Sequence, residues 1–436
     1  MARRRLLPAR SAPLFAALIA LLPAAGRATD FKYQLGMAVS HSDNIRLTES
    51  NPIGDTILAP KLSIEANHQS SSLRFNAIGR AQLLHYTGNS YDDELRGELT
   101  GELVWTVIPD RLEFVANDWL SRQPIDVLTN FVPTNQQEVN VFLAGPSLHA
   151  RFGPSTRGQI DLRYGNTHAG NTKDFNGNRY KAAARLVRDL NPLTTASVNV
   201  DATRVMFDTK QLISDFTRYG AYLGFARKLS ALDLTINAGG ARIERRAGSS
   251  ESAPIAQLRL NWQMSPRSSI RTDADLEFGD TAQYTTTVMG ALGDPTYDGL
   301  TSADLAAGPA IFRSRQLQLT YRYQGDLFGF RIYPQYQRFD FLEGKLAQQT
   351  SRSGAIEVSY LLSNQLSLAL SGERQRRDFE GLDRTDTNTA IRLSLIHELA
   401  RHWSYRFDLQ HRKLDSSAAG LSYNVNEIAF AFVYQR

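Results

Sequence analysis

The 436-residue sequence contains no cysteine. A disulfide framework is therefore excluded, and so is a lipoprotein anchored through an N-terminal cysteine. A chain of this kind gains its stability from packing and from backbone hydrogen bonds. In a lipid environment, complete pairing of the backbone donors and acceptors is obligatory in any case.

The sequence also lacks an apolar run long enough to cross a bilayer as a helix, which requires roughly 20 residues. The candidate near the start, Leu14–Leu22, is shorter than this and follows a basic segment that includes Arg3–Arg5. Gly26 and Ala28 then provide the small-x-small pattern that signal peptidase recognises. We interpret residues 1–28 as a signal peptide, with a retained signal anchor as the alternative.

An excess of positive charge is missing from the rest of the chain. The formal net charge is +5, and residues 1–28 hold five arginines and no acidic residue. Residues 29–436 are therefore neutral overall. They lack the basic footprint that is typical of nucleic-acid-binding proteins, so no nucleic-acid partner is predicted.

Motifs for enzyme chemistry are missing too. The eight histidines are scattered and form no His-x-x-x-His pair or other cluster suited to a metal ion. The sequence has no Gly-x-Ser-x-Gly elbow and no phosphate-binding glycine loop. We predict no catalytic residues, no metal, no cofactor and no enzymatic activity. A hydrolase built from Ser, His and an acid on neighbouring strands is the remaining enzymatic alternative.

What the sequence does contain is a repeated alternation of apolar and polar residues. Within Gln316–Gln324, Leu317, Leu319, Tyr321 and Tyr323 alternate with polar side chains. A period of two places apolar side chains on one face of a strand and polar ones on the other. About twenty such stretches follow one another after residue 28. This pattern predicts a transmembrane β-barrel whose apolar face meets lipid and whose polar face lines a wet lumen.

The connections between these stretches are alternately tight and long. The tight turns use Pro, Asn, Asp, Gly and Ser, which supply a fixed φ, a left-handed conformation or local hydrogen bonds. Tight turns in the periplasm and long loops outside predict one all-β domain, residues 29–436. It is a single antiparallel transmembrane β-barrel of about 20 strands, with 18 as the alternative and both termini periplasmic. The expected turns lie near residues 70–72, 109–111, 153–156, 191–193, 229–231, 265–267, 325–327, 363–365 and 399–401.

Two predicted loops, Asp280–Arg313 and Arg122–Val139, are longer than the others. Three glycines and a proline between residues 290 and 299 argue against a regular element in the first of them. Loops of such length are commonly either functional or disordered. Two hypotheses remain open for Asp280–Arg313: it folds into the lumen as a constriction, or it extends into solvent.

The four tryptophans support the orientation. Trp105, Trp262 and Trp403 lie within a few residues of tight turns, where an interfacial aromatic girdle is expected. Trp119 approaches the opposite rim of the barrel.

The polar faces of the strands carry charges of both signs. A charged lumen wall could bind or filter a polar solute, as charged rings do in pores. The alternative is that opposite charges pair across strands and stiffen the wall. Both roles are compatible. The lumen-lining candidates are Arg259, Arg271, Asp273, Asp275, Glu277, Arg322, Arg331, Glu357, Arg406 and Asp408.

Three segments resemble a known group of proteins: Ser42–Ile45, Leu112–Asp126 (LEFVANDWLSRQPID) and Phe142–Tyr164 (FLAGPSLHARFGPSTRGQIDLRY). They are similar to the outer-membrane proteins associated with the PEP-CTERM/exosortase system, within the broader β-barrel porin group. This resemblance implies the outer membrane of a diderm bacterium and a setting of exopolysaccharide production and protein sorting. It implies no catalytic residues and no defined transported substrate.

The sequence therefore predicts a porin-like conduit in the outer membrane, associated with exopolysaccharide production or export. A non-conducting scaffold for an envelope complex is the alternative. Expected partners are outer-membrane lipid, a polysaccharide or other polar solute, and the outer-membrane assembly machinery. The last of these is indicated by the alternating Ile428, Phe430, Phe432 and Tyr434 of the final strand, although the chain ends in Gln435-Arg436.

Overall fold

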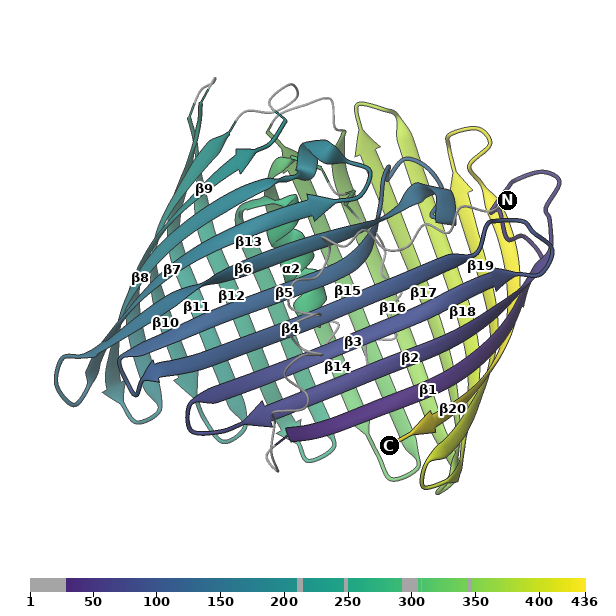
Figure 1. The fold of residues 1–436 in the computed structure, drawn as a ribbon, viewed down its shortest axis with the longest axis horizontal. Coiled ribbons are helices and arrows are strands. Elements are labelled where there is room, and N and C mark those ends of the chain that lie inside the picture. The colour runs from purple at the N-terminus through teal and green to yellow at the C-terminus, as the bar shows by residue number, and fades with distance from the viewer. Residues whose placement is uncertain (1–28, 210–214, 247–249, 292–304, 307, 343–346) are drawn as a thin grey trace.

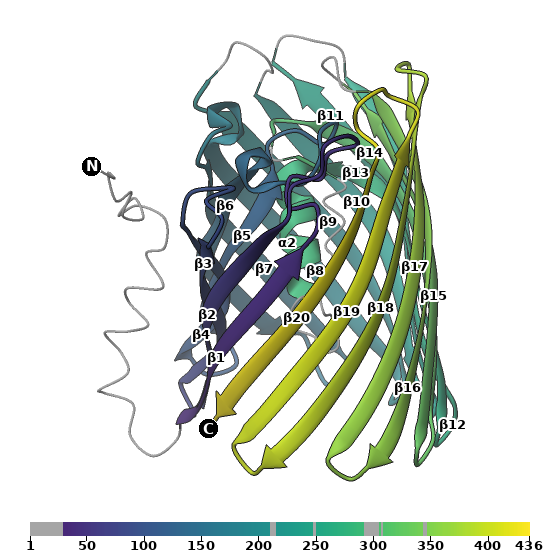
Figure 2. The ribbon, with the colours of Figure 1, turned by 90° about the vertical axis from the view of Figure 1, so that its right-hand side faces the viewer.

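The computed structural model describes residues 29–209, 215–246, 250–291, 305–306, 308–342 and 347–436. The predicted signal peptide lies outside these residues. Twenty strands form one antiparallel sheet, in which each strand pairs with the next and β20 pairs with β1, so the sheet closes (Figures 1 and 2). The first ten strands are β1 (Thr29–Ser42), β2 (Asp55–Gln69), β3 (Leu73–Tyr86), β4 (Glu94–Ile108), β5 (Leu112–Pro124), β6 (Gln136–Arg151), β7 (Thr156–Ala169), β8 (Gly177–Asn191), β9 (Thr194–Phe207) and β10 (Phe216–Lys228). The others are β11 (Leu232–Arg245), β12 (Glu251–Ser265), β13 (Ser268–Asp280), β14 (Ile311–Gln324), β15 (Phe328–Phe341), β16 (Gln348–Ser363), β17 (Leu366–Glu380), β18 (Arg384–Ala400), β19 (Trp403–Ser416) and β20 (Tyr423–Gln435).

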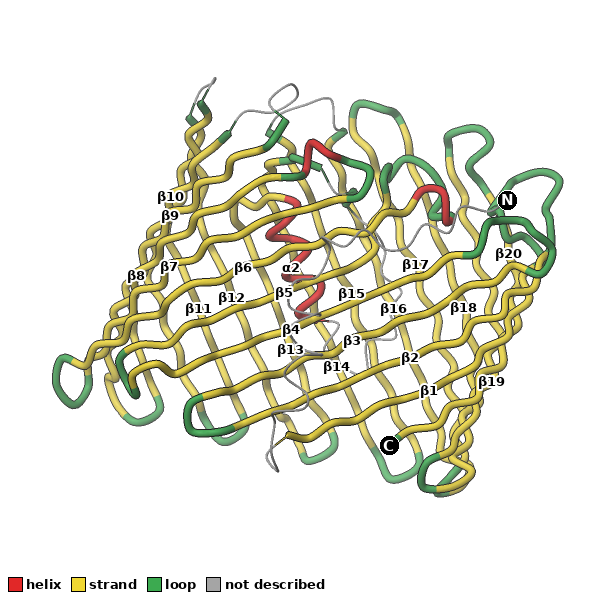
Figure 3. Tube along the Cα trace, viewed as in Figure 1, coloured by secondary structure: helices red, strands yellow, loops and turns green. Residues whose placement is uncertain are grey.

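The predicted closed antiparallel barrel of about 20 strands is confirmed, and the alternative of 18 strands is wrong. Short turns lie at one end and longer connections at the other (Figure 3). The turn between β18 and β19 differs slightly from the prediction, because β18 continues to Ala400 and leaves only residues 401–402. The start of β1 and the C-terminus both lie at the short-turn end (Figure 2).

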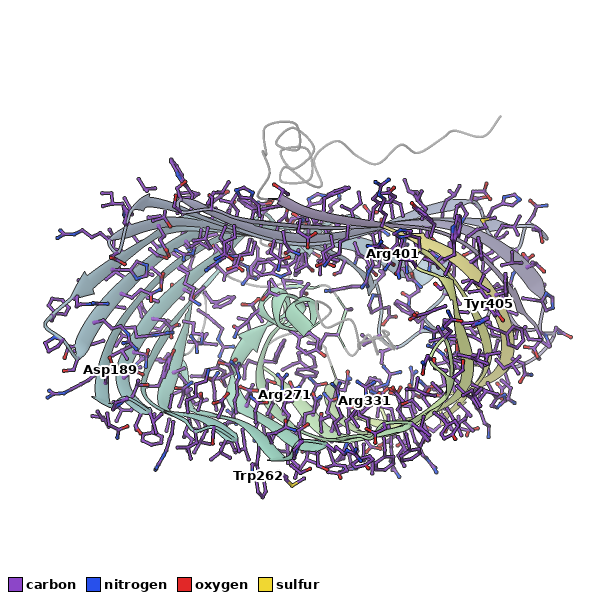
Figure 4. The ribbon with its side chains drawn as sticks, turned by 90° about the horizontal axis from the view of Figure 1, so that it is seen from below. Asp189, Trp262, Arg271, Arg331, Arg401 and Tyr405 are labelled. Atoms are coloured by element: carbon purple, nitrogen blue, oxygen red, sulfur yellow. The ribbon has the colours of Figure 1, made fainter. Side chains whose placement is uncertain are left out.

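The two faces of the sheet differ as the alternation predicts. Figure 4 looks into the barrel from the short-turn end: Trp262 points outward, whereas Arg271 and Arg331 point into the lumen. Side chains alternate along each strand, and residues paired across strands share a face. The registers of the paired strands therefore assign a face to the residues of every strand.

The outer face is apolar and exposed. Trp262 pairs with Ile270, and Ile270 pairs with Tyr321, so this outer row reaches β14. On the same face of β14, Leu317 and Leu319 are 49% and 37% exposed. Exposure of large apolar side chains along a strand is typical of a surface that faces lipid.

Three of the four tryptophans lie on this outer face beside short turns. Trp105, Trp262 and Trp403 are all exposed there, and the Trp403 ring stacks on Phe432 with ring centroids 4.9 Å apart. Trp119 is different. It packs against buried residues of the inner wall, so it contributes to the lumen and not to a girdle.

At the long-loop end, two hairpins lose contact with one neighbouring strand. The pairing of β12 with β13 begins at Ala256 and Leu276, although β13 continues to Asp280 and still pairs with β14 there. On the other side of the barrel, the pairing of β4 with β5 ends at Leu99 and Leu120. Strands released from one neighbour are free to bend away from the wall.

A helix, α2 (Thr281–Ala291), continues from the end of β13 and lies inside the barrel (Figure 4). The expectation that no regular element occurs in Asp280–Arg313 is therefore wrong. The carboxylate of Asp280 caps the helix, since its Oδ1 accepts hydrogen bonds from the backbone N–H groups of Ala282 (2.9 Å) and Gln283 (3.2 Å). The glycines and the proline lie near or beyond the end of the helix. No helix in the described part of the chain is both long and apolar enough to span a bilayer.

Candidate functional site: a divided lumen

The lumen contains a partition, which we define as Glu277–Ala291, the end of β13 together with α2. Its helix contacts β13 on one side and both β5 and β6 on the other. Across this second contact, Gln123 Nε2 donates a hydrogen bond of 2.6 Å to Thr285 Oγ1. Ala282 joins the apolar cluster formed by Val139 and Trp119. The partition therefore bridges two walls that are far apart in the sequence.

A buried ion pair anchors the base of the partition. Arg179 on β8 makes two contacts with Asp280: Nη2 lies 2.7 Å from Oδ1, and Nη1 lies 2.8 Å from Oδ2. Both side chains are less than a tenth exposed. Because β8 and β13 are not neighbours in the sheet, this pair spans the lumen. One carboxylate thus caps the helix and fixes it to a distant strand.

Glu277 forms a second polar layer beneath the ion pair. Its Oε1 accepts a hydrogen bond of 3.1 Å from Gln283 of the helix, and its Oε2 lies 3.9 Å from the guanidinium of Arg218. Arg218 in turn contacts Asp201 at 2.5 Å. The charges are therefore compensated within a group of polar side chains that links β9, β10 and β13.

Apolar packing closes the space between the partition and strands β9–β12. The buried side chains of Phe278 and Ile311, at the ends of β13 and β14, pack against the inner wall. By strict alternation Phe278 would share the outer face with Leu276. It is buried because the end of β13 has left the wall and bends over β12 and β11. The residues of this inner wall are Val205, Phe207, Phe216, Ala241, Ile243, Ala253 and Ile255.

The opposite flank of the partition contacts β14 and β15. Tyr284 of the helix meets Phe339 edge to face, with ring centroids 5.4 Å apart. Phe339 also packs against Phe312, with centroids 4.9 Å apart. The partition is thus held by an ion pair at its base, aromatic packing along one flank and a hydrogen bond to β5.

The second long connection, between β5 and β6, lies over the mouth of the barrel. It contains the short 3₁₀ helix η1 (Pro133–Asn135). Asn130 Nδ2 donates to the carbonyl of Leu47 in the β1–β2 loop at 2.7 Å. Arg384 on β18 donates to the carbonyl of Leu128 at 2.6 Å. This connection therefore reaches strands on the far side of the mouth.

Registers place the predicted lumen residues on the face of Arg271 and Arg331. Arg259 lies opposite Asp273, and Arg322 lies opposite Arg331. Ion pairs join Arg271 to Asp273 (2.7 Å), Arg331 to Glu357, and Arg406 to Asp408 (2.8 Å). Only the Arg331 pair crosses strands, so the expected cross-strand pairing is mixed with pairing along one strand. Asp275 lies opposite Gln257 and Gln316, and Glu277 belongs to the partition. Their role in passage of a solute stays a prediction.

The sequence reading missed a polar, uncharged surface on the inner face of β14–β18, which we call the amide wall. Gln318 lies opposite Gln335, and Gln335 lies opposite Ser353. The row continues through Gln375 to Asn388. This surface presents amides and hydroxyls, which both donate and accept hydrogen bonds. Its partly exposed residues are Gln316, Gln318, Gln335, Ser353 and Asn388, whereas Gln337, Ser351 and Gln375 on the same face are buried.

Comparison with known proteins agrees with a barrel of this kind. Residues 345–436, which include β16–β20, match the family described as "Putative beta-barrel porin 2". In fold, the chain is a closed antiparallel β-barrel, which is the architecture that the description of this family names. The family match lies at the opposite end of the chain from the segments that resemble PEP-CTERM-associated proteins. A comparison with curated proteins found no match.

Several solved structures are similar over nearly the whole chain. The FrpB iron transporter from Neisseria meningitidis is 9% identical, with 96% of this chain and 83% of that chain covered and a TM-score of 0.46. The ferric enterobactin receptor PfeA from Pseudomonas aeruginosa is 8% identical, with 93% and 81% covered and a TM-score of 0.47. OccK2 (OpdF) from the same organism is 10% identical, with 93% and 97% covered and a TM-score of 0.39.

Proposed function

We propose that this protein is an outer-membrane conduit of a diderm bacterium, through which a polar solute passes beside the partition. The observation that carries the proposal is the partition itself: a capped helix held inside a polar-walled barrel by Arg179 and Gln123. A helix fixed in the lumen narrows the passage through the barrel without blocking it. The lumen of some membrane barrels is occupied by loops or a helix, and the width and the lining groups of a pore set its selectivity.

The two sides of the partition are not equivalent. Toward β9–β12, buried apolar side chains such as Phe278 and Ile243 fill the space beside it. Toward β15–β18, the amide wall and the charged pair of Arg331 and Glu357 face the lumen. Water and polar solutes are excluded from an apolar packed region but solvate a polar wall. The proposed path therefore runs along β15–β20.

The chemistry of the amide wall favours a solute rich in hydroxyl groups. Side-chain amides offer donors and acceptors together, which matches a hydroxyl better than a fixed charge does. More specifically, we propose that the protein takes part in exopolysaccharide production or export. This proposal is supported by the polar wall and by the resemblance of Ser42–Ile45, Leu112–Asp126 and Phe142–Tyr164 to proteins of that setting.

Single-channel recording in planar bilayers tests the conduit. The wild-type protein is compared with a variant in which residues 281–310 are replaced by a short Gly-Ser link. The replacement leaves the pairing of all twenty strands intact, so the variant should fold and migrate as a heat-modifiable barrel. We expect a measurable conductance for the wild type and a larger one for the variant. Absence of conductance in both proteins rejects the conduit.

Vesicle swelling with neutral oligosaccharides tests the class of solute. Gln318→Leu together with Gln335→Leu should slow oligosaccharide entry several-fold while the ion conductance stays close to that of the wild type. Gln159→Leu, on β7 away from the amide wall, is the matched control and should have no effect. Equal slowing by the control would reject the amide wall as the contact surface for sugars.

A second function, that of a non-conducting scaffold, is favoured by one observation. The β5–β6 connection is bonded across the mouth to Leu47 and Arg384, and its neighbour Gln123 holds the helix below. Together these contacts could seal the barrel. The same conductance experiment separates the two functions, because a sealed barrel conducts only after residues 281–310 are removed.

A further inference from the structure

Three exposed arginines lie on the outer face of β16 and β17. The outer row that begins at Trp262 runs through Ile332 and Ile356 to Gly372. Residues two and four positions along these strands share that face. Arg352, Arg374 and Arg376 are therefore directed away from the lumen, and all three are exposed.

Their height on the barrel is set by the length of the strands. Arg352 lies ten residues from Leu362, an exposed apolar residue at the short-turn end of β16. Arg376 lies ten residues from Leu366, at the same end of β17. Ten residues at roughly 3.3 Å each, inclined by about 40°, rise about 25 Å, which is the height of the apolar band of such barrels. The arginines are thus at the upper edge of that band.

The charges of this group are not balanced by acidic residues. Arg352 and Arg376 are directly opposite each other in the register, an arrangement that is destabilising for like charges. Asp378 contacts both, at 3.2 Å and 3.1 Å. Arg374 has no acidic partner among the described residues, and it lies opposite Gly354 and Thr389. The three guanidinium groups therefore share one nearby carboxylate, which contacts only two of them.

Another arginine at the same height shows the contrast. Arg242 lies ten residues above Leu232, at the short-turn end of β11, and is exposed on the outer face. Its Nε lies 3.1 Å from Oε1 of Glu244, and its Nη2 bonds to Ser250 at 3.0 Å. The charge of Arg242 is compensated on its own strand. Arg242 therefore differs from Arg374, which has no acidic partner among the described residues.

The surface directly below the arginines is open and then apolar. Gly354 and Gly372 have no atom within 4 Å of the position where a Cβ would lie, so the sheet has open space there. Below them, Ile356, Leu370 and Ile391 are about half exposed. Charged groups thus lie above a shallow step and an apolar surface. A lipid with an anionic headgroup and acyl chains has the same order of polarity.

We propose that Arg352, Arg374 and Arg376 bind the phosphate groups of an anionic lipid in the outer leaflet, whose acyl chains lie on the apolar surface below. Guanidinium groups form paired, charge-assisted hydrogen bonds with phosphate. A bound phosphate also relieves the repulsion between Arg352 and Arg376. The proposal needs only that the barrel spans the membrane with its short turns on the periplasmic side. It stands whether or not the lumen conducts.

Native mass spectrometry of the full barrel in detergent tests the proposal. The probe is bisphosphorylated lipid A, and the comparison lipid is lipid A from which both phosphates have been removed. We expect the wild type to retain the phosphorylated lipid. The variant Arg352→Gln, Arg374→Gln, Arg376→Gln should retain it at least about tenfold less, since three charge-assisted contacts are lost.

Two controls make the result specific. Arg188→Gln, Arg227→Gln, Arg267→Gln removes the same charge from exposed positions near the short turns and should leave retention unchanged. Arg374→Gln alone breaks no ion pair, so it should fold normally and still lower retention. Equal retention by the wild type and the triple variant would overturn the proposal, as would equal retention of the phosphate-free lipid. Stabilisation by inorganic phosphate alone, to the same extent as by lipid A, would reject a lipid as the ligand.

Discussion

Strand β13 behaves differently along its two halves. From Ser268 to Leu276 it has neighbours on both sides, and its charged residues face the lumen while Ile270 and Ala274 face outward. Beyond Leu276 it pairs with β14 alone, and Phe278 is buried inside the barrel. Alternation predicts facing only where a strand is held in the wall by both neighbours. Where one neighbour ends, the packing of the released segment decides.

The largest expected effect concerns the base of the partition. Arg179→Ala leaves Asp280 as a buried charge without its partner, which costs about 3–5 kcal/mol in comparable buried pairs. The barrel wall should persist, while the helix leaves its place. Hydrogen exchange of Thr281–Thr286 should become fast, and single-channel conductance should rise. Arg271→Ala, which breaks a more exposed pair with Asp273, should cost no more than about 1 kcal/mol and leave α2 protected.

A smaller effect is expected for the wall itself. Leu319→Arg places a charge on the lipid-facing surface. It should destabilise the folded barrel in vesicles by about 2–4 kcal/mol if Leu319 lies near the midplane. Gln318→Arg adds the same side chain to the lumen face and should change folding very little. Urea titration of both variants in lipid vesicles measures the difference. Equal losses would show that the assigned faces are wrong.

The smallest effect is on selectivity. Asp273→Lys together with Asp275→Lys reverses two charges on the inner face of the lower, wall-bound half of β13. If solutes pass along this wall, the ion permeability ratio should shift toward anions by a few-fold, because rings of charge bias the local ion concentration. Reversal potentials in a salt gradient measure it. Arg188→Glu, on the outside near a short turn, should leave the permeability ratio unchanged. If only this control shifted the ratio, the lumen charges would not determine ion selectivity.

Much of the barrel was predictable from local rules. The turn residues and the period of two predicted the antiparallel order, the apolar outer face and a strand number of about 20, with 18 as the alternative. The helix carried a local signal as well: Asp280 precedes Gln283 with the spacing of a capping box, and the six residues between Gln283 and Gly290 include no Gly or Pro. The glycines further along the connection favour irregular structure, so the helix was not predicted.

The contacts that define the candidate site could not be predicted from the sequence. Arg179 and Asp280 are 101 positions apart, and Gln123 and Thr285 are 162 positions apart. Pairings of this kind depend on how the hairpin ends bend, which no periodicity encodes. The amide wall was overlooked for another reason. Its residues fit the alternation, but uncharged amides and hydroxyls carry no signal in the sequence that distinguishes a surface for solute contact from an ordinary polar strand face.

The position of α2 against β5 is the central claim, and cysteine cross-linking tests it directly. The chain has no native cysteine, so Gln123→Cys with Thr285→Cys gives two unique thiols. In lipid vesicles, a short bismaleimide should link them, and mass spectrometry should detect the joined peptides. The pair Arg406→Cys with Thr285→Cys, on a wall that the helix does not contact, should remain unlinked. Absence of the 123–285 link, or equal linking of both pairs, would contradict a partition held against β5.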